Sequence, residues 1–523
     1  MKRQHKAGIA DVNPFYLNYG IRVAVDQNVL KYFINKQKRM KKKNSFIISF
    51  VSLALLVVTS CARNPVTGKK QVVLMSEKQE IAMGKEADPQ IIAQFGLYED
   101  TALQNFINLK GKQMAAISHR PKLDYGFRVL DSEVLNAFAV PGGYVYFTRG
   151  ILSHFNSEAD FAGVLGHELG HITHRHGVAQ QRNAILGQIG IIAGIIIAPQ
   201  LAQFAEAAST GLQLLFLKYS RDAEREADEL GVEYSSKIGY DAQQMANFFT
   251  TLERKSAGTE SAELPEFLST HPNPGDRNAT VSKLAAEWKQ KLNLTNPQVN
   301  RNTYLRRIEG LIYGEDPKGG YLENNVFYHP VLKFQFPAPP NWNYQNTPQR
   351  VQFAPKDGKA LMFLTLVPGN SLQETANAVL QQYKLVPVET RNTTVNGLSA
   401  IYVIADQQPA QQGQPALRTM SYFIQYNGSI YHMIGVSTIN DFNNYADSFS
   451  TAMQGFRQLT DQAKINKKPE RVRIKTVSKA STLVQVFRNY NVAERRHEEF
   501  AILNGMKLTD NVPAGTMIKI IAE

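Results

Sequence analysis

Apolar residues recur with a helical period over much of the first half of the chain. Between residues 64 and 120 this period predicts mostly helix. Residues 135–140 and 144–148 instead form two short apolar runs on either side of Pro141-Gly142-Gly143, which predicts a β-hairpin. Another amphipathic helix is predicted at residues 241–256. The probable core contacts of the first helical region are Ile81, Met83, Ile91, Ile92, Phe95, Leu103, Phe106, Ile107 and Leu109.

Residues 184–198 are the most apolar stretch after the N-terminal region. A helix that spans a membrane needs about 20 apolar residues, and this stretch is shorter and is interrupted by Gln188. We therefore expect a buried or surface-docking helix here.

Short alternating runs replace the helical period in the second half of the chain. Residues 361–366, 400–404 and 430–436 predict strands, and helical patterns at 372–383 and 446–455 interrupt them, which favours an α+β sandwich. An Asn-rich linker at 292–302 precedes this region, whose beginning at 336–342 resembles PsbP-like domains. A second linker, Lys467-Lys468-Pro469, leads into a strand, a helix and a final strand.

This last segment, residues 472–522, resembles a LysM domain. The Gly-Asp-Thr element of such domains is replaced here by Ala480-Ser481-Thr482. Glycan binding and a packing or targeting role are therefore both open for this segment.

Length and charge limit the protein classes that fit. The 523 residues provide material for about three domains. The net charge of +13 is concentrated at the N-terminus, because residues 1–60 carry +9 and leave +4 for the rest. The charge therefore indicates no nucleic-acid partner.

The basic run Met40-Lys41-Lys42-Lys43 is followed by apolar residues 46–58, as in a secretory signal. This segment ends at Ser60-Cys61, which resembles a bacterial lipobox, so we expect Cys61, the only cysteine, to be lipidated after cleavage. The alternative for Cys61 is a buried small apolar residue. We expect residues 1–39 to reflect a start codon assigned too early; the alternative is a genuine N-terminal extension.

The candidate chemistry lies in His167-Glu168-Leu169-Gly170-His171. On a helix the two imidazoles lie one turn apart on the same face, where both reach one metal ion, and Glu168 lies beside the metal, where it can take a proton from a water molecule. About 0.02 HExxH matches are expected by chance in a chain of this composition. The alternative is a solvated helix that happens to carry two histidines.

A catalytic zinc ion needs a third protein ligand. The metzincin pattern requires Gly at 174 and His at 177, whereas this chain has His174 and Gly177, so that class is excluded. Glu224 is the best candidate ligand, and Asp228, one turn further on, can accept the second ring proton of a ligating histidine. Taken alone, this charge-rich helix is more often a solvated face.

Together these motifs resemble the zinc-dependent gluzincin peptidase family of the CAAX-prenyl endopeptidases and BepA. The resemblance covers residues 62–290 and includes Asn136-Ala137-Phe138-Ala139-Val140-Pro141-Gly142-Gly143, the HExxH motif with Arg175-His176, Ser220-Arg221 with Glu224 and Asp228, and Ser269-Thr270-His271-Pro272 with Arg277.

The resemblance implies one Zn²⁺ per chain, held by His167, His171 and Glu224, with Glu168 as the base. Asp228 and Arg277 would orient the ligands, and His271 would lie near the open coordination position, either stabilising the oxyanion or closing the site. Asn136, Ala137, Phe138 and Ala139 would form the strand that pairs with an extended substrate; the alternative is an ordinary edge strand. His174 matches no family role.

We therefore predict a multi-domain protein with a mainly α zincin-type metallopeptidase domain with a small edge β-sheet (61–290), an α+β domain (302–462) and a small LysM-like domain (470–523), after a lipoprotein signal peptide at 40–60. The predicted function is a zinc metalloendopeptidase of the bacterial cell envelope that acts on misfolded or envelope proteins. The alternatives are a non-catalytic or chaperone-like lipoprotein and a scaffold that binds the cell wall. The expected partners are a polypeptide substrate, the membrane through lipidated Cys61, and peptidoglycan or envelope assembly proteins. We expect the catalytic domain to be exported, with the periplasmic side as its location.

Overall fold

A computed structural model of the chain describes residues 61–72, 75–184, 191–192, 195–196, 198–201, 204, 219–257, 267, 270–271, 276–409 and 415–523. The predicted N-terminal extension and the signal segment lie outside these ranges, as do Ser269 and Pro272 of the motif around His271. Cys61 begins the short strand β1 (Cys61–Arg63), which pairs with β2 (Lys70–Val72). Within the described ranges, no helix has the length and apolar character needed to cross a membrane.

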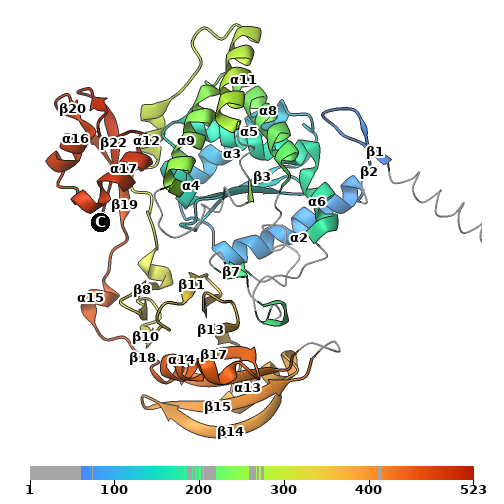
Figure 1. The fold of residues 1–523 in the computed structure, drawn as a ribbon, viewed down its shortest axis with the longest axis vertical. Coiled ribbons are helices and arrows are strands. Elements are labelled where there is room, and N and C mark those ends of the chain that lie inside the picture. Colours follow the sequence, from blue (N-terminus) through green and yellow to red (C-terminus); the bar gives the residue numbers. More distant parts are fainter. Residues whose placement is uncertain are drawn as a thin grey trace, which may run out of the picture. The chain divides into compact units, whose positions relative to one another are not determined.

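Helices dominate the region that follows, and Figure 1 shows α5, α8, α9 and α11 gathered together, in agreement with their mutual contacts. The helices of this region are α2 (Glu77–Phe95), α3 (Thr101–Ala116), α4 (Arg149–His154), α5 (Glu158–His174), α6 (His176–Ala184), α8 (Arg221–Lys237), α9 (Gln243–Ala257), α11 (Arg277–Lys291) and α12 (Arg301–Arg307).

A small three-stranded sheet accompanies these helices. Its central strand β5 (Tyr144–Thr148) pairs in parallel with β3 (Gly126–Leu130) and antiparallel with β4 (Ala137–Val140). The hairpin predicted around Pro141-Gly142-Gly143 is therefore present as β4 and β5. Gly142 and Gly143 make the turn at φ of 92° and 105°, which glycine adopts without a steric penalty.

The central helix α5 is buried along its whole length. It begins at the N-cap Ser157, whose side chain accepts a hydrogen bond from the backbone N–H of Asp160, and it ends at Arg175, which has a left-handed φ of 61°. The residues of α5 are apolar on average, as expected for a helix that is enclosed on all sides. The HExxH motif on this helix therefore lies inside the protein.

Small residues allow α5 and α8 to approach each other closely. A Cβ atom added at Gly166 would meet Gly231 Cα at 2.9 Å, and one added at Gly170 would meet Ala227 Cα at 3.0 Å. No larger side chain fits at these two positions without moving one of the helices. Ala227 of α8 lies at this contact and is buried.

Three details of the predicted helices are wrong. Ile81 and Leu109, which the periodicity assigns to the core, are 39% and 56% exposed. Within the apolar stretch 184–198, Ile191–Ile192 and Ile195–Ile196 form the paired strands β6 and β7 and not a helix. Isoleucine is β-branched and favours strands. In a short apolar run, periodicity alone does not distinguish a strand from a helix.

The second half of the chain is rich in β-structure. Its strands are β8 (Tyr321–Glu323), β9 (Val326–His329), β10 (Phe334–Pro337), β11 (Asn343–Asn346), β12 (Arg350–Ala354), β13 (Ala360–Val367), β14 (Val386–Val395), β15 (Leu398–Gln407), β16 (Leu417–Tyr426), β17 (Ser429–Thr438) and β18 (Arg457–Gln458). Seven of them form an antiparallel sheet in the order β11-β12-β13-β17-β16-β15-β14, and β18-β10-β9-β8 form a second sheet.

One helix covers each face of the seven-stranded sheet. On one face α14 (Phe442–Gln454) places Phe449 and Met453 against Tyr422. On the other face α13 (Leu372–Gln382) places Val379 in a cluster with Phe423. The alternating residues of the strands thus supply two separate hydrophobic layers.

The C-terminal segment shares its core with the helical region. It contains β19 (Arg471–Thr476), β20 (Ser481–Thr482), α16 (Leu483–Asn489), α17 (His497–Leu503), β21 (Asn511–Val512) and β22 (Met517–Ala522), with β19 paired to β22 and β20 to β21. On β22 the buried Lys519 donates hydrogen bonds from Nζ to the carbonyl oxygens of Ser153 and Phe155, at 2.8 and 2.9 Å. Its apolar residues belong to the same cluster as those of α5, so this segment packs on the helical region.

Candidate metal centre

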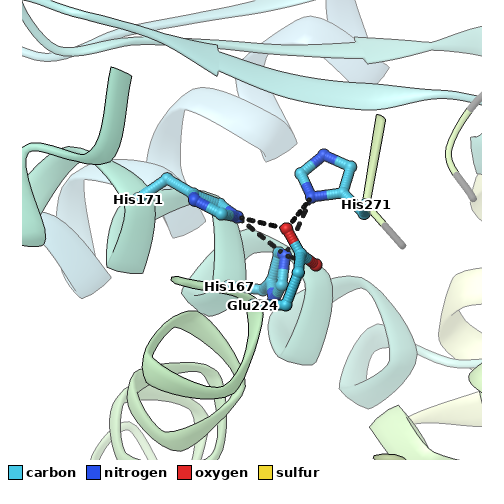
Figure 2. A group of neighbouring side chains, drawn as sticks. All are labelled: His167, His171, Glu224 and His271. Carbon is cyan, nitrogen blue, oxygen red and sulfur yellow. Dashed lines mark hydrogen bonds and ion pairs between the residues drawn. The ribbon is translucent and has the colours of Figure 1, made fainter. Parts of the chain in front are cut away.

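Four side chains from separate parts of the chain converge beside α5. His167, His171, Glu224 and His271 are all buried, and one ligand atom of each lies within 4.8 Å of the others. His167 Nε2 lies 3.0 Å from His171 Nε2, while the Glu224 oxygens lie 3.6 and 3.5 Å from these two nitrogens. Figure 2 shows the four side chains pointing toward one common position.

Different elements supply the members of this group. His167 and His171 are one turn apart on α5, and Glu224 lies in the first turn of α8, where Ser220 caps the helix by accepting from Ala223 N–H. His271 donates its backbone N–H to the carbonyl of Phe267, and its ring stacks on the Phe267 ring with centroids 4.6 Å apart. The close packing of α5 and α8 is therefore what brings Glu224 to the histidine pair.

His167 is held from behind by Asp228 and Arg277. Asp228 Oδ1 lies 2.8 Å from His167 Nδ1. Arg277 donates to both oxygens of Asp228, at 2.7 and 2.8 Å, and to Glu224 Oε2 at 3.2 Å. Burial by itself raises the pKa of Asp228, but the Arg277 guanidinium and His167 outweigh it and hold this pKa below its usual value. An ionised Asp228 fixes the His167 proton on Nδ1 and leaves Nε2 free as a ligand.

His171 has its own neighbours on the side away from Glu224. Its Nδ1 lies 3.0 Å from His176 Nδ1, and His176 Nε2 lies 2.9 Å from Glu226 Oε2. The ring of Tyr219 stacks on His171 with centroids 4.0 Å apart. Burial, followed by the positive potential of His167 and His176, lowers the pKa of His171 well below its usual value, so this imidazole is neutral and can act as a ligand.

Glu168 lies beside the group with no hydrogen-bond partner. Both of its carboxylate oxygens are buried, and neither accepts a hydrogen bond from a described residue. His271 Nε2 lies 3.7 Å from Glu168 Oε1. Burial raises the pKa of Glu168, and His271 and His167 oppose this rise. Such a carboxylate is suited to accept and return a proton.

The donor set fits a zinc ion. Two imidazole nitrogens and one carboxylate are a common ligand set of catalytic zinc, and the unpartnered oxygens of Glu168 leave a buried acceptor for a water molecule. Burial raises the pKa of Glu224, yet His271, His167 and Arg277 outweigh it and keep this pKa below its usual value. The carboxylate is therefore ionised, as a ligand must be.

The strand predicted to bind substrate lies at an edge of the small sheet. Asn136 directly precedes β4, which contains Ala137, Phe138 and Ala139, and one side of β4 has no partner strand among the described residues. A pocket between this strand and the metal centre is lined by Glu80, Ala139, Val140, Pro141, His171, Ile172, Arg175, Gly177, Val178 and Tyr219.

The structure thus brings together the residues that the sequence singles out at 167, 168, 171, 224, 228, 271 and 277. Cys61 lies at the start of β1, far along the chain from these residues. Sequence reasoning missed three neighbours of the site. Tyr219 stacks on His171 and Phe267 stacks on His271, while Glu226 contacts His176, the neighbour of His171. Tyr219 directly precedes the Ser220-Arg221 motif, and this position is the feature of the sequence that could have identified it as a neighbour of the site.

Part of the helical region matches the model of a known protein family. Residues 102–285 match the model of "Peptidase family M48", whose members are zinc-dependent. A beta-barrel assembly-enhancing protease of Yersinia pestis is 30% identical over 263 residues, which cover 48% of this chain and 52% of the relative. The mitochondrial metalloendopeptidase OMA1 of Arabidopsis thaliana is 30% identical over 191 residues, which cover 36% of each chain.

The chain spans about half the length of the first of these curated relatives. Among solved structures, cyanobacterial PsbP from Synechocystis sp. PCC 6803 aligns with a TM-score of 0.21 and 8% identity, covering 25% of this chain and 91% of that chain.

Proposed function

Since residues 102–285 match the model of peptidase family M48, we propose that this chain is a zinc-dependent metalloendopeptidase of the bacterial cell envelope. The observation that carries the proposal is the convergence of His167, His171 and Glu224 beside an unpartnered, buried Glu168. These are the parts that hydrolysis of a peptide bond requires.

In the proposed mechanism His167, His171 and Glu224 would hold the zinc ion. When bound, it would supply Lewis-acid polarisation of the scissile carbonyl and activation of a water molecule. Glu168 accepts the proton of this water on a carboxylate oxygen and then delivers it to the nitrogen of the leaving amine. Burial, which raises the pKa of Glu168, makes its carboxylate a better acceptor of this proton. Asp228 and Arg277 keep His167 oriented throughout.

The edge strand β4 is the proposed docking place of the substrate. An extended polypeptide can pair with the free side of this strand through main-chain hydrogen bonds, which do not depend on the substrate sequence. The buried Asn136 Oδ1 accepts no hydrogen bond from a described residue and is available to a substrate N–H. This mode of binding suits unfolded segments of misfolded or envelope proteins, which we propose as the substrate class.

We assign His271 the role of a gate. Its Nδ1 lies 3.2 Å from His167 Nε2 and 3.1 Å from Glu224 Oε1, within the ligand group itself. An imidazole at this position occupies the space that the attacking water and the substrate carbonyl need. The alternative role for His271, stabilisation of the oxyanion, requires it to move away from the ligands.

The closed arrangement also favours a second candidate function. A site kept shut by His271 fits a chaperone-like envelope lipoprotein whose zinc is structural. Hydrolysis by the zinc-loaded protein separates the two functions, because only the peptidase cleaves an unfolded substrate.

Export and anchoring complete the proposal. The basic and apolar run that ends at Cys61 supports a lipidated cysteine that holds the protein on a membrane, with the catalytic region on the periplasmic side. Mass spectrometry of the mature N-terminus tests this part: a diacylated or triacylated Cys61 is expected, and an N-terminus upstream of Met40 would contradict it.

The test of the activity is the variant Glu168→Gln in the full chain. Because it keeps the ligands and removes only the proton acceptor, we expect the same zinc content as in the wild type but a loss of casein cleavage of about 10²-fold or more. Glu229→Gln, which changes an exposed carboxylate on α8, is the control and should cleave normally. Cleavage by Glu168→Gln at the wild-type rate would refute the assignment.

A further inference from the structure

A second group of potential ligands lies next to the metal centre. His174 ends α5, His176 begins α6 and Glu226 lies on α8, and one ligand atom of each is within 4.8 Å of the others. His176 Nε2 is 2.9 Å and His174 Nδ1 is 3.7 Å from Glu226 Oε2. Two imidazoles and one carboxylate are again a donor set typical of zinc, and donor atoms around one zinc ion lie about 3–4 Å apart.

His174 carries the independent observation that points to a ligand. Its side chain is only 4% exposed, and its Nδ1 is buried with no hydrogen-bond partner among the described residues. Buried polar atoms are nearly always hydrogen-bonded, so an orphaned imidazole nitrogen needs an explanation. The contact with Glu226 gives His176 Nε2 a partner, but it does not provide His174 Nδ1 with a hydrogen bond. A cation shared by all three residues would satisfy it.

Charge and access are consistent with a cation. Burial, followed by His176, lowers the pKa of His174 to about 4, so at neutral pH this imidazole is uncharged and offers a lone pair. The ionised Glu226 gives the group a net negative charge, and its side chain is 47% exposed. An ion can therefore enter from solvent at Glu226, and water can complete the coordination.

We propose that His174, His176 and Glu226 form a second divalent-cation site, specific for a transition metal such as zinc, next to the catalytic one. This site does not depend on the proposed peptidase activity, since it uses none of the residues assigned to the catalytic centre.

The two sites are linked by the contact between His176 and His171. When His171 binds a metal through Nε2, its Nδ1 carries the ring proton and donates to His176 Nδ1, which places the proton of His176 on Nε2, facing Glu226. A cation bound at His176 Nε2 displaces the proton from this nitrogen, so the ring proton of His176 moves to Nδ1. There it faces the Nδ1 proton of His171, and the two N–H groups repel each other. Occupation of the second site therefore weakens the hold of His171 on the first ion.

The test counts metal ions in the full chain. The protein is stripped with a chelator and dialysed against increasing zinc, and the bound zinc per chain is measured by elemental analysis. The wild type should bind two zinc ions at saturation, and His174→Gln and Glu226→Gln should each bind one. His329→Gln removes a histidine from the β-rich region and should still bind two. Because Glu226 is half exposed, Glu226→Gln should fold even if His174→Gln does not.

A wild-type protein that saturates at one zinc, or two zinc ions retained by Glu226→Gln, would overturn the proposal. The same would follow if His329→Gln also lost an ion, because the extra zinc would then bind at His329 and not at the proposed site. The count is independent of casein cleavage, so failure of the peptidase assignment leaves this result readable.

The link between the sites has its own readout and rests on the proposed function. Casein cleavage by the wild type should fall as zinc rises from one to two equivalents, and cleavage by Glu226→Gln should not fall. A constant rate in the wild type would overturn the link, while the zinc count still decides the site.

Discussion

Asp228 Oδ1 lies 2.8 Å from His167 Nδ1, and Arg277 donates to both oxygens of the same carboxylate. The buried carboxylate therefore joins a metal ligand to a fixed cation. This arrangement sets the tautomer and the ring orientation of His167.

The first prediction concerns this contact. Asp228→Asn removes the charge that favours the proton on His167 Nδ1 and leaves Arg277 without its counter-ion, so zinc affinity should fall by about 10–100-fold. Competition with a chelator measures it. Asp222→Asn, a substitution of a largely exposed carboxylate on the same helix, serves as the control and should keep wild-type affinity. Equal affinity in both variants would show that Asp228 does not support the metal.

The second prediction concerns the proposed gate. Because His271 Nδ1 lies within the ligand group, His271→Ala should open the site and raise casein cleavage about tenfold, equivalent to the loss of a closing contact of about 1.4 kcal/mol. Its zinc content should stay at the wild-type level. The opposite result, a strong loss of cleavage with zinc retained, would instead assign His271 to stabilisation of the oxyanion.

The third prediction concerns the packing of α5 on α8. A methyl group at position 166 would meet the backbone of Gly231, so Gly166→Ala should destabilise the helical region by about 1–3 kcal/mol and weaken zinc binding by displacing Glu224. Thermal unfolding and zinc content measure the two effects. At Gly319 an added Cβ meets nothing within 4 Å, so Gly319→Ala is the control. Normal stability and zinc content in Gly166→Ala would contradict the close approach.

The fourth prediction is a pH dependence in the β-rich region. Burial lowers the pKa of His432 from 6.5 to about 3 in the seven-stranded sheet, where its ring stacks on Phe423 with centroids 4.3 Å apart. As pH falls below 6.5 the unfolded chain gains a proton at His432 that the folded chain does not. His432 therefore costs up to about 1.4 kcal/mol of stability per pH unit between 6.5 and about 3.

The variant His432→Gln, which cannot titrate, should lose part of this acid sensitivity. Urea midpoints at pH 7.5, 6 and 4.5 measure the change. Phe423→Leu disturbs the same contact without removing the titrating group, so its destabilisation should be equal at all three pH values. If His432→Gln and the wild type lose stability in parallel, His432 is not the cause.

The sequence by itself determined the local chemistry of this protein. The spacing of His167, Glu168 and His171 is a property of any α-helix, and so is the spacing of Glu224 and Asp228, so these predictions needed only the helical period. The hairpin of β4 and β5 followed in the same way from Pro141-Gly142-Gly143.

Only the tertiary structure decided which groups meet. The distance between Glu224 and the histidine pair depends on the contact of Gly166 with Gly231, two residues 65 positions apart, and no local pattern encodes it. The same holds for the exposure of Ile81 and Leu109, since periodicity finds apolar positions but not the element that covers them. The sequence also could not show that His174 Nδ1 has no hydrogen-bond partner among the described residues, because hydrogen bonding depends on which groups the fold brings close together.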